Sequence, residues 1–471
     1  MRPQFSVTGP VWCPQRSFRP ALRGRRRLWW PAGVLAVVVV GVAACGGGGS
    51  SPAAAGDSGS PATVTAPPQL EACVAGSRVP CYGQDPLHKV YDLGALYARG
   101  ITGAGTTVAV VDDGANPWAR RDLAVFDRFF RLPPAELRVL AWGRGAPGRV
   151  DPAAAREDIG DLELAHFIAP RARLLYVQVR PGQGLAPVAE AMAALGAVAA
   201  RQHISVASLS WGIPETAIAR GKLAALRAGL VSAARQHVSV IAATGDSGPT
   251  WPGLGRRVVA WPASDPLVTA VGGDVVQAGP SGQRLRPDTV AGGLNATGAG
   301  LSALFPRPSY QNHVARVVGD HRGIADVSMD CAMWVYARIP NDPQATGWFS
   351  VCGTSLAAPM FAGIAALADQ QAGHRLGLLN PLLYRLHGPG DGVLDVTSGS
   401  NTDDGVRGFR ATHGFDLPSG IGTVGSAPEF ITALAGHQPF TPCQPAGRGM
   451  SLGTSPSAVP ATLECSTGGL R

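Results

Sequence analysis

Gly353-Thr354-Ser355-Leu356-Ala357-Ala358-Pro359 stands immediately before a run of small and apolar residues, Met360 to Ala368. This composition predicts a buried helix over Ser355 to Gln371, in which Pro359 is tolerated because it falls in the first turn. A serine at a helix N-terminus has its alkoxide favoured by the helix dipole, and its backbone N–H can donate to an oxyanion. Ser355 is therefore a candidate nucleophile, and the alternative is a serine that only caps a buried helix.

Apolar, β-branched runs alternate with helical stretches along the chain from about Cys81 onward. The strand candidates are Thr107 to Val111, Leu174 to Val179, Ser205 to Ser210, Val238 to Ala243 and Leu267 to Val271. The other helix candidates are Ala186 to Gln202 and Ala217 to Arg235. Near-continuous apolar strands that alternate with helices indicate an α/β fold with a buried parallel sheet and helices on both faces.

The Gly-Thr-Ser-x-x-x-Pro run resembles the signature shared by subtilisins and sedolisins, which implies a subtilisin-like fold. Subtilisin-like enzymes carry a His-Gly-Thr-His segment after the first strand, and none of the ten histidines lies in such a segment. Val108 to Gly114 is similar to the subtilisin aspartate strand, but an aspartate without its histidine cannot complete that triad. The resemblance is therefore to the sedolisins, which use a carboxylate as the base.

Glu157 to Pro170 is similar to the sedolisin base segment, which carries a Glu and an Asp four residues apart and then an Ala-His-x-Ile-Ala-Pro stretch. The resemblance assigns Glu157 as general base and Asp161 as its partner. Spacing of i and i+4 places both carboxyls on one helix face, where they can share a proton. A solvated acidic helix face is the alternative. Asp158 is a second candidate base, because Gly160 stands where a larger apolar residue is expected and costs about 1 kcal/mol in a helix.

Ala242 to Gly248 follows an apolar strand and resembles the Ser-Gly-Asp-x-Gly motif of sedolisins. The resemblance implies that a protonated Asp246 donates a hydrogen bond to the oxyanion, with the N–H of Ser355 as second donor. A turn aspartate that accepts from its own backbone is the alternative. Further stretches that fit the family extend the match from Cys81 to Leu434, namely Ser208 to Gly212 with Glu215, Trp261 to Ser264, Val271 to Gly273, Phe305 to Gln311 and Ala325 to Ser328.

Two later segments, Leu394 to Gly399 and Ala411 to Asp416, are similar to the sedolisin calcium loop. Thr412 replaces the glycine that is usual in this loop, and aspartates that only stabilise turns are the alternative. Carboxylates and backbone carbonyls are ligands that Ca²⁺ accepts. The resemblance implies one calcium ion, held by the carboxylates of Asp395 and Asp416 and by the carbonyls of Val396, Thr412 and Gly414.

The N-terminal region has the layout of an export signal, because Arg23 to Arg27 precede an apolar run from Leu28 to Ala44. The run ends in Val42-Ala43-Ala44-Cys45, which resembles a bacterial lipobox and implies that Cys45 carries the lipid; an ordinary membrane anchor is the alternative. Residues 1–44 are therefore expected to be a lipoprotein-type signal peptide. Residues 45–72 are rich in Gly, Ser, Pro and Ala, which predicts a flexible tether. Residues 73–436 form the expected sedolisin-like peptidase domain, and 437–471 a cysteine-containing extension.

Charge and cysteines agree with an exported protein. Seven arginines and no acidic residue lie in the first 44 positions, so 33 basic and 32 acidic residues remain and no nucleic-acid partner is indicated. Six cysteines remain after Cys13 and Cys45, and an even number in an oxidising compartment suggests three disulfides. Their clustering favours the pairs Cys73 with Cys81, Cys331 with Cys352, and Cys443 with Cys465.

The expected function is that of a serine peptidase, which hydrolyses protein or peptide substrates through an acyl-enzyme at acidic pH. The expected location is extracytoplasmic, on the cytoplasmic membrane of a bacterium through the lipid anchor. Sedolisins usually carry a large N-terminal prodomain, whereas about 35 residues separate Cys45 from Cys81. This departure supports an alternative function, a catalytically silent, lipid-anchored binding protein on a peptidase scaffold.

Overall fold

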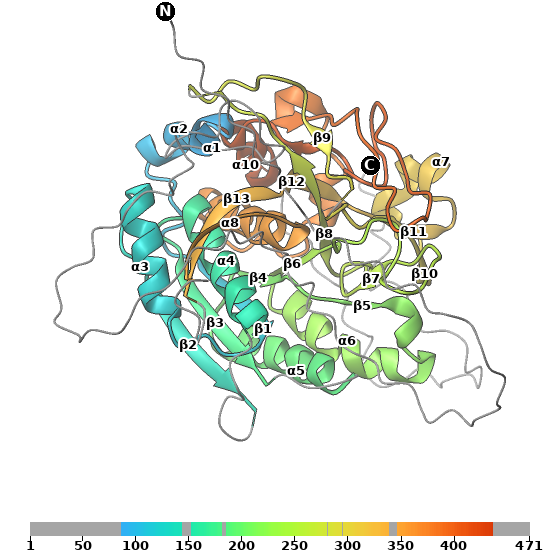
Figure 1. Cartoon of the computed structure of the whole chain (residues 1–471), viewed down its shortest axis with the longest axis horizontal. Coiled ribbons are helices and arrows are strands. Elements are labelled where there is room, and N and C mark those ends of the chain that lie inside the picture. The colour runs from blue at the N-terminus through green and yellow to red at the C-terminus, as the bar shows by residue number, and fades with distance from the viewer. Residues whose placement is uncertain are drawn as a thin grey trace, which may run out of the picture. The chain divides into compact units, whose positions relative to one another are not determined.

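The computed structural model describes residues 86–143, 152–180, 185–279, 281–293, 295–338 and 346–436. Within them, a ten-stranded sheet carries helices on both faces (Figure 1). Its strands lie in the order β15, β16, β12, β8, β6, β4, β1, β3 and β2, with β9 paired to β8. Neighbours run parallel except in the pairs β15 with β16 and β8 with β9. The strands are β1 (Thr107–Asp113), β2 (Leu137–Trp142), β3 (Arg173–Val179), β4 (Val206–Leu209), β6 (Ser239–Ala243), β8 (Thr269–Val275), β9 (Thr289–Val290), β12 (Val327–Asp330), β15 (Val393–Leu394) and β16 (Thr423–Val424).

Helices and three short ladders complete the described part of the chain. The helices are α1 (Pro86–Val90), α2 (Leu93–Ala98), α3 (Ala119–Phe130), α4 (Pro152–Ile168), α5 (Leu185–Arg201), α6 (Arg220–Arg235), α7 (Ala315–Val318), α8 (Thr354–Ala372), α9 (Asn380–Leu383) and α10 (Ala427–Ala435). The antiparallel ladders outside the main sheet are β5 (Ile213–Pro214) with β7 (Ala260–Trp261), β10 (Gly300–Pro306) with β11 (His321–Ile324), and β13 (Ala332–Ala337) with β14 (Gly347–Cys352).

The five predicted strands are all present and form the middle of the sheet, as β8, β6, β4, β1 and β3. The prediction of an α/β fold with a parallel sheet is therefore confirmed. β8 begins at Thr269 rather than at the predicted Leu267. The reason is a turn held by Asp265, which accepts the N–H of Leu267 on its side chain at 3.1 Å and that of Val268 on its backbone carbonyl at 2.9 Å.

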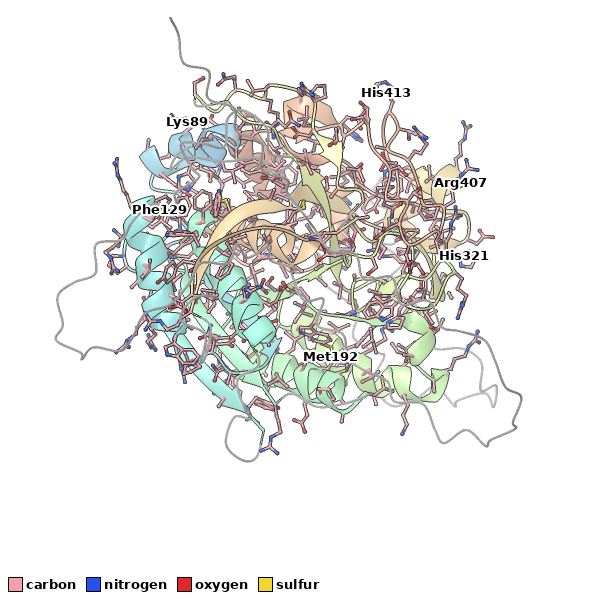
Figure 2. The ribbon with its side chains drawn as sticks, viewed as in Figure 1. Lys89, Phe129, Met192, His321, Arg407 and His413 are labelled. Atoms are coloured by element: carbon pink, nitrogen blue, oxygen red, sulfur yellow. A yellow bond between two sulfur atoms is a disulfide. The ribbon has the colours of Figure 1, made fainter. Side chains whose placement is uncertain are left out.

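The sheet separates two hydrophobic cores, which the alternation of side chains along β1 shows directly. Val108 and Val110 point into a core shared with α3, α4 and α8, whereas Ala109 and Val111 point into a core shared with α5 and α6. Figure 2 shows Phe129 on α3 and Met192 on α5, which belong to the first and second core respectively. Because successive residues of a strand face opposite sides, an unbroken apolar strand requires helices on both faces.

The start of α6 differs from the sequence prediction. The helix was expected from Ala217, but residues 215–217 form a separate 3₁₀ turn and α6 begins at Arg220. The buried carboxylate of Glu215 accepts hydrogen bonds from Ser302 Oγ at 2.5 Å and from the N–H of Ala303 at 2.7 Å. These long-range bonds hold the turn against β10, and no local helix signal could have indicated them.

The hairpin of β13 and β14 leads directly into α8 and is closed at its base by a disulfide. Cys331 and Cys352 are bonded, which confirms one of the three predicted pairs. The other two predicted pairs, together with Cys45, the signal peptide, the tether and the C-terminal extension, lie outside the described residues. None of the helices in the described segments has the length and apolar character needed to span a bilayer.

Candidate active site

Ser355 is the second residue of α8, at the point where β14 ends and the helix begins. Gly353 is the N-cap, with extended backbone, and the N–H of Leu356 returns to its carbonyl at 3.0 Å. The N–H of Ser355 belongs to the first helical turn, where no carbonyl four residues earlier lies within the helix to accept it. Ser355 is buried, with 5% of its surface exposed. The sequence prediction of a serine at a helix start is confirmed in position.

Asp246 reaches the same helix end from the loop after β6. Its Oδ1 accepts the N–H of Thr354 at 2.7 Å and the hydroxyl of Thr354 at 2.9 Å. A Cβ added at Gly353 would lie 2.8 Å from Oδ2 of Asp246 and 3.2 Å from Oγ of Ser355, so both atoms crowd the same bare glycine. Burial raises the pKa of Asp246 to about 6, although the two bonds from Thr354 act in the opposite direction. Below that pH the carboxyl carries a proton and is able to donate.

Helix α4 carries Glu157 and Asp161, as the sequence predicted, and packs beside α8. Glu157 is half-buried and lines the same pocket as Asp246 and Ser355, whereas Asp161 is fully buried and is not among the lining residues. Burial, and then the negative charges of Asp112 and Glu157, raise the pKa of Asp161 well above its usual value, while the hydroxyl of Ser210 lowers it. One carboxyl of the pair is thus strongly biased to keep a proton.

Gly160, which departs from the family pattern, lies where α4 meets α8. A Cβ at this position would be 3.4 Å from Leu356 Cδ2 and 3.5 Å from Val335 Cγ1. Both distances are ordinary van der Waals contacts, so a methyl group would fit here beside α8 and β13. Close packing of the backbone does not require glycine at this position.

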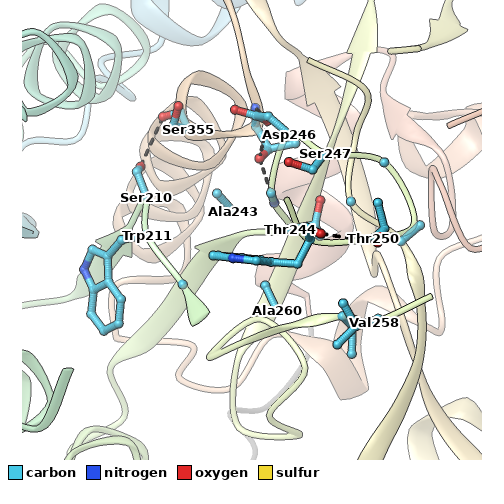
Figure 3. Close-up of a pocket in the computed structure, with 18 of the residues that line it drawn as sticks. Ser210, Trp211, Ala243, Thr244, Asp246, Ser247, Thr250, Val258, Ala260 and Ser355 are labelled. Atoms are coloured by element: carbon cyan, nitrogen blue, oxygen red, sulfur yellow. Dashed lines mark hydrogen bonds between the residues drawn. The ribbon is translucent and has the colours of Figure 1, made fainter. Parts of the chain in front are cut away.

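Ser355, Asp246 and Glu157 line one pocket, and Figure 3 shows Ser355 and Asp246 in it. In the close-up, Ser355 and Asp246 lie side by side at the start of α8, and Ser210 Oγ donates to the carbonyl of Ser355 at 3.1 Å. No histidine is among the residues found to line this pocket. Its lining is Glu157, Ser210, Trp211, Gly212, Ala243, Thr244, Gly245, Asp246, Ser247, Gly248, Thr250, Trp251, Val258, Val259, Ala260, Gly298, Ala299, Thr354 and Ser355.

Asp158, the other base considered from the sequence, does not line this pocket. It is 1% exposed, and the hydroxyl of Tyr176 donates to its Oδ2. Asp112, in the last part of β1, received no role in the sequence analysis, and its charge acts on the pKa of Asp161. The signal for it was the likeness of Val108 to Gly114 to an aspartate strand, which was discounted because the matching histidine is missing.

The predicted calcium ligands lie on two loops that approach each other. Asp416 Oδ2 accepts the N–H of Thr412 at 2.8 Å, and Asp395 Oδ2 accepts the N–H of Gly414 at 3.0 Å. Burial raises the pKa of Asp416 to about 6, to which the charge of Asp395 adds, so the two carboxylates repel each other. No group of three or more His, Cys, Asp or Glu side chains suited to a metal was found in the described segments. Two carboxylates with the carbonyl of Val396 nevertheless match the oxygen chemistry of a calcium ligand set.

Comparisons with known proteins agree with this arrangement. A family model described as the subtilase family matches residues 153–377, which include Glu157, Asp161, Asp246 and Ser355. The chain is 30% identical to kumamolisin of Bacillus sp. (strain MN-32) over 69% of its own length and 60% of that protein. It is 31% identical to human tripeptidyl-peptidase 1 over 64% of its own length and 55% of that protein.

The solved structure of Pseudomonas sedolisin, a serine-carboxyl proteinase in complex with two molecules of pseudo-iodotyrostatin, is similar over 76% of this chain and 98% of that one. The TM-score is 0.66 and the identity 25%. The chain spans 60% and 55% of the two curated relatives named above. The sheet order, the pocket and these matches together show that this chain has the subtilisin-like fold and belongs to the subtilase/sedolisin family.

Proposed function

We propose that this protein is a serine-carboxyl peptidase that hydrolyses peptide bonds through an acyl-enzyme at acidic pH. The observation that supports this most is the shared pocket, in which Ser355, Glu157 and Asp246 come from three separate segments of the chain. A binding protein that had lost catalysis would have no need to keep all three. Membership of the family and a likeness to a serine-carboxyl proteinase support the same activity.

The first half of the reaction forms the acyl-enzyme. Ser355 Oγ attacks the carbonyl carbon of the scissile peptide bond and gives its proton to the carboxylate of Glu157. The carbonyl oxygen becomes an oxyanion, which accepts hydrogen bonds from the N–H of Ser355 and from protonated Asp246. The C–N bond then breaks, and Glu157 returns the proton to the leaving amine, so that the new N-terminus departs neutral at this step.

The second half releases the acyl group with the same residues in the same roles. Glu157 takes a proton from water, which attacks the ester carbon, and the proton then passes to Ser355 Oγ as the ester bond breaks. Asp161 is fully buried, and its raised pKa keeps a proton within the pair. A carboxylate pair that shares one proton is a base that can also act as an acid, which each half of the reaction requires.

Calcium is the proposed metal of this protein. Asp395 and Asp416 would hold it with the carbonyls of Val396, Thr412 and Gly414, on loops away from the residues that line the catalytic pocket. Because this metal would bridge two loops of the folded chain, its expected effect is on stability. The proposed location is extracytoplasmic, with Cys45 as the lipid-carrying residue.

The activity is tested by digestion of one long unstructured peptide at pH 4 with the purified protein, followed by mass spectrometry of the products. Ser355→Ala should reduce cleavage to background while the melting temperature stays close to that of the wild type, because only one hydroxyl is removed. Ser232→Ala is the matched control, since Ser232 lies on α6 and donates to Gly196. Equal cleavage by the wild type and Ser355→Ala would exclude Ser355 as the nucleophile. The product ends separate endopeptidase from tripeptidyl-peptidase action.

A further inference from the structure

Asp158 and Tyr176 form a buried polar pair that the proposed reaction does not use. Asp158 lies on α4 directly after Glu157, and Tyr176 lies in the middle of β3. Asp158 is 1% exposed and Tyr176 is fully buried. The Tyr176 hydroxyl donates a hydrogen bond to Oδ2 of Asp158. A carboxyl at such depth is costly unless hydrogen bonds support it, so the pair needs a physical explanation.

The pair is enclosed by three elements of the catalytic region. Tyr176 is paired in register with Val110 of β1, two residues before Asp112. A Cβ added at Gly114, in the turn after β1, would lie 3.2 Å from Oδ2 of Asp158. Helix α4, strand β3 and the end of β1 therefore meet at this hydrogen bond. Any shift of Asp158 would move the turn of α4 that also carries Glu157.

The charged groups that raise the pKa values of Tyr176 and Asp161 include carboxyls on α4 and β1. Burial raises the pKa of Tyr176 strongly, and the charges of Asp158 and Asp112 raise it further, while Gln178 lowers it. Burial also dominates the raised pKa of Asp161, to which Asp112, Glu157 and finally Asp158 contribute. The raised pKa of Tyr176 keeps its hydroxyl protonated, so this hydroxyl is the donor in the hydrogen bond to Oδ2 of Asp158.

We propose that Asp158 and Tyr176 are positioning residues for the dyad: their hydrogen bond fixes the dyad-bearing turn of α4 against β3, and the carboxylate of Asp158 helps to retain the dyad's shared proton. The inference rests on the proposed peptidase function. Its physical basis is that a negative charge beside two carboxyls disfavours a further negative charge, and that a hydrogen bond to a carboxylate favours its charged form. Neither residue is expected to touch the substrate, because neither lines the pocket.

Two substitutions separate the effect of the Asp158–Tyr176 hydrogen bond from the effect of the Asp158 charge. Asp158→Asn keeps an oxygen that accepts the Tyr176 hydrogen bond but removes the charge. The fall of kcat/KM on the acid side of its pH profile should therefore move to lower pH by about 0.5 to 1 unit, with kcat nearly unchanged. Tyr176→Phe removes the donor and frees the turn, so kcat should fall roughly tenfold at an unchanged KM. The loss of activity at higher pH, expected because Asp246 must be protonated, should occur at the same pH in both variants.

The matched control is Tyr97→Phe, which removes the hydroxyl of a half-buried tyrosine bonded to α4. Tyr97 donates to the carbonyl of Ile168 at 2.8 Å, at the far end of that helix. This variant should lose some thermal stability and keep the wild-type pH profile. The double variant Asp158→Asn with Tyr176→Phe should lose no more kcat than Tyr176→Phe alone, because the pair acts as one unit.

Several results would overturn the inference. One is a low-pH fall of kcat/KM in Asp158→Asn that superimposes on that of the wild type. Another is a kcat and a pH dependence of Tyr176→Phe that match those of Tyr97→Phe. If Tyr176→Phe does not fold, the Asp158→Asn profile decides. A wild type without peptidase activity would contradict the proposed function itself. The pair would then be judged by melting temperatures, in which additive effects of the two substitutions would show that Asp158 and Tyr176 are not coupled.

Discussion

At the scale of single residues, Asp246 and Ser355 meet at Gly353, and the missing side chain of that glycine permits the approach. Any Cβ there would come within 2.8 Å of Asp246 Oδ2. Thr354 holds the other carboxylate oxygen through its backbone and hydroxyl, so Oδ2 is the oxygen left for a proton. An aspartate placed in this way acts as an oxyanion donor only when protonated, which ties the chemistry to pH.

The pH dependence of peptide hydrolysis follows from these opposed protonation needs. Asp246 must be protonated, and its pKa is raised to about 6, so activity should fall as pH rises through about 6. In the proposed reaction Glu157 must be free of its proton, so activity should also fall in strong acid. The expected profile of kcat/KM from pH 2.5 to 8.5 is a bell with its maximum between these limits.

Two substitutions assign the limbs of that profile to their residues. Glu157→Gln should lower kcat by about 10² to 10⁴, the usual contribution of a general base. Asp246→Asn should extend the alkaline limb, because an amide donates a hydrogen bond without a titrating proton. Asp320→Asn, at a fully exposed side chain, is the control and should leave the profile unchanged. A neutral optimum together with a fully active Glu157→Gln would rule out the assignment.

At the scale of elements, the two predicted calcium loops are joined by few bonds of their own. Asp395 accepts the N–H of Gly414 and lies 3.5 Å from Nδ1 of His413, while Asp416 is also held by the N–H and hydroxyl of Ser419. The mutual repulsion of the two carboxylates opposes their closeness unless a cation lies between them. The loops are therefore the part of the fold where metal would stabilise most.

Calcium should raise the melting temperature, and a chelator should lower it. A ligand at 100 times its Kd that binds only the folded state adds about 2.7 kcal/mol to the free energy of unfolding. Asp416→Ala should melt at a lower temperature and no longer respond to calcium, whereas Asp320→Ala should respond as the wild type does. Scanning calorimetry with calcium and with chelator measures both effects. A wild-type melting temperature that is indifferent to chelator would contradict the site.

At the scale of the whole molecule, buried carboxyls with raised pKa values extend well beyond the catalytic pocket. Burial raises the pKa of each, and the charge of Asp288 contributes for Asp274. The values are about 6 for Asp122, about 7 for Asp127, about 7 for Asp274 and about 8 for Asp369. Each group binds its proton more tightly in the folded state than in the unfolded chain, where carboxyls titrate near pH 4. Folding is therefore linked to proton uptake above that pH.

Thermal stability should consequently fall as pH rises from about 4 to 8. The protonated carboxyls contribute stability that is fully present below pH 4 and is lost as pH rises through their pKa values in the folded state. His166, whose pKa burial lowers to about 4, opposes this trend, because its stabilising neutral form is lost as pH falls from 6.5 towards 4. Melting temperatures across this range measure the net slope. Asp127→Asn should flatten it and exposed Asp320→Asn should not. A melting temperature that rises towards pH 8 would contradict the linkage.

Membrane attachment is the other whole-molecule prediction, and it depends on Cys45 alone. Cys45→Ala should move the protein from the membrane to the soluble fraction of a bacterial host, because no lipid can then be attached. Cys13→Ala is the matched control and should stay with the membrane. If Cys45→Ala remains in the membrane pellet after a high-salt wash, the anchor is a retained apolar helix instead.

Local patterns in the sequence determined the elements and the family. The five central strands, α5 and α8 were predictable because hydrophobic periodicity and helix starts are local properties of the sequence. Glu157 and Asp161 share a face because residues four positions apart lie on one side of any α-helix. The Cys331–Cys352 bond followed from proximity along the chain, and it is confirmed. The catalytic roles and the calcium ligands came through family resemblance and stay predictions.

Only the tertiary structure decided which side chains meet. Nothing local shows that Glu157, Asp246 and Ser355 line one pocket, because the sheet and the packing of α4 on α8 bring together segments about 90 to 110 residues apart. The fold also brings the charge of Asp112 in β1 to bear on Asp161, and places the hydroxyl of Tyr176 in β3 on Asp158, the residue after Glu157. Burial and charge proximity set the pKa values, and both are properties of the folded chain that no short stretch of sequence contains.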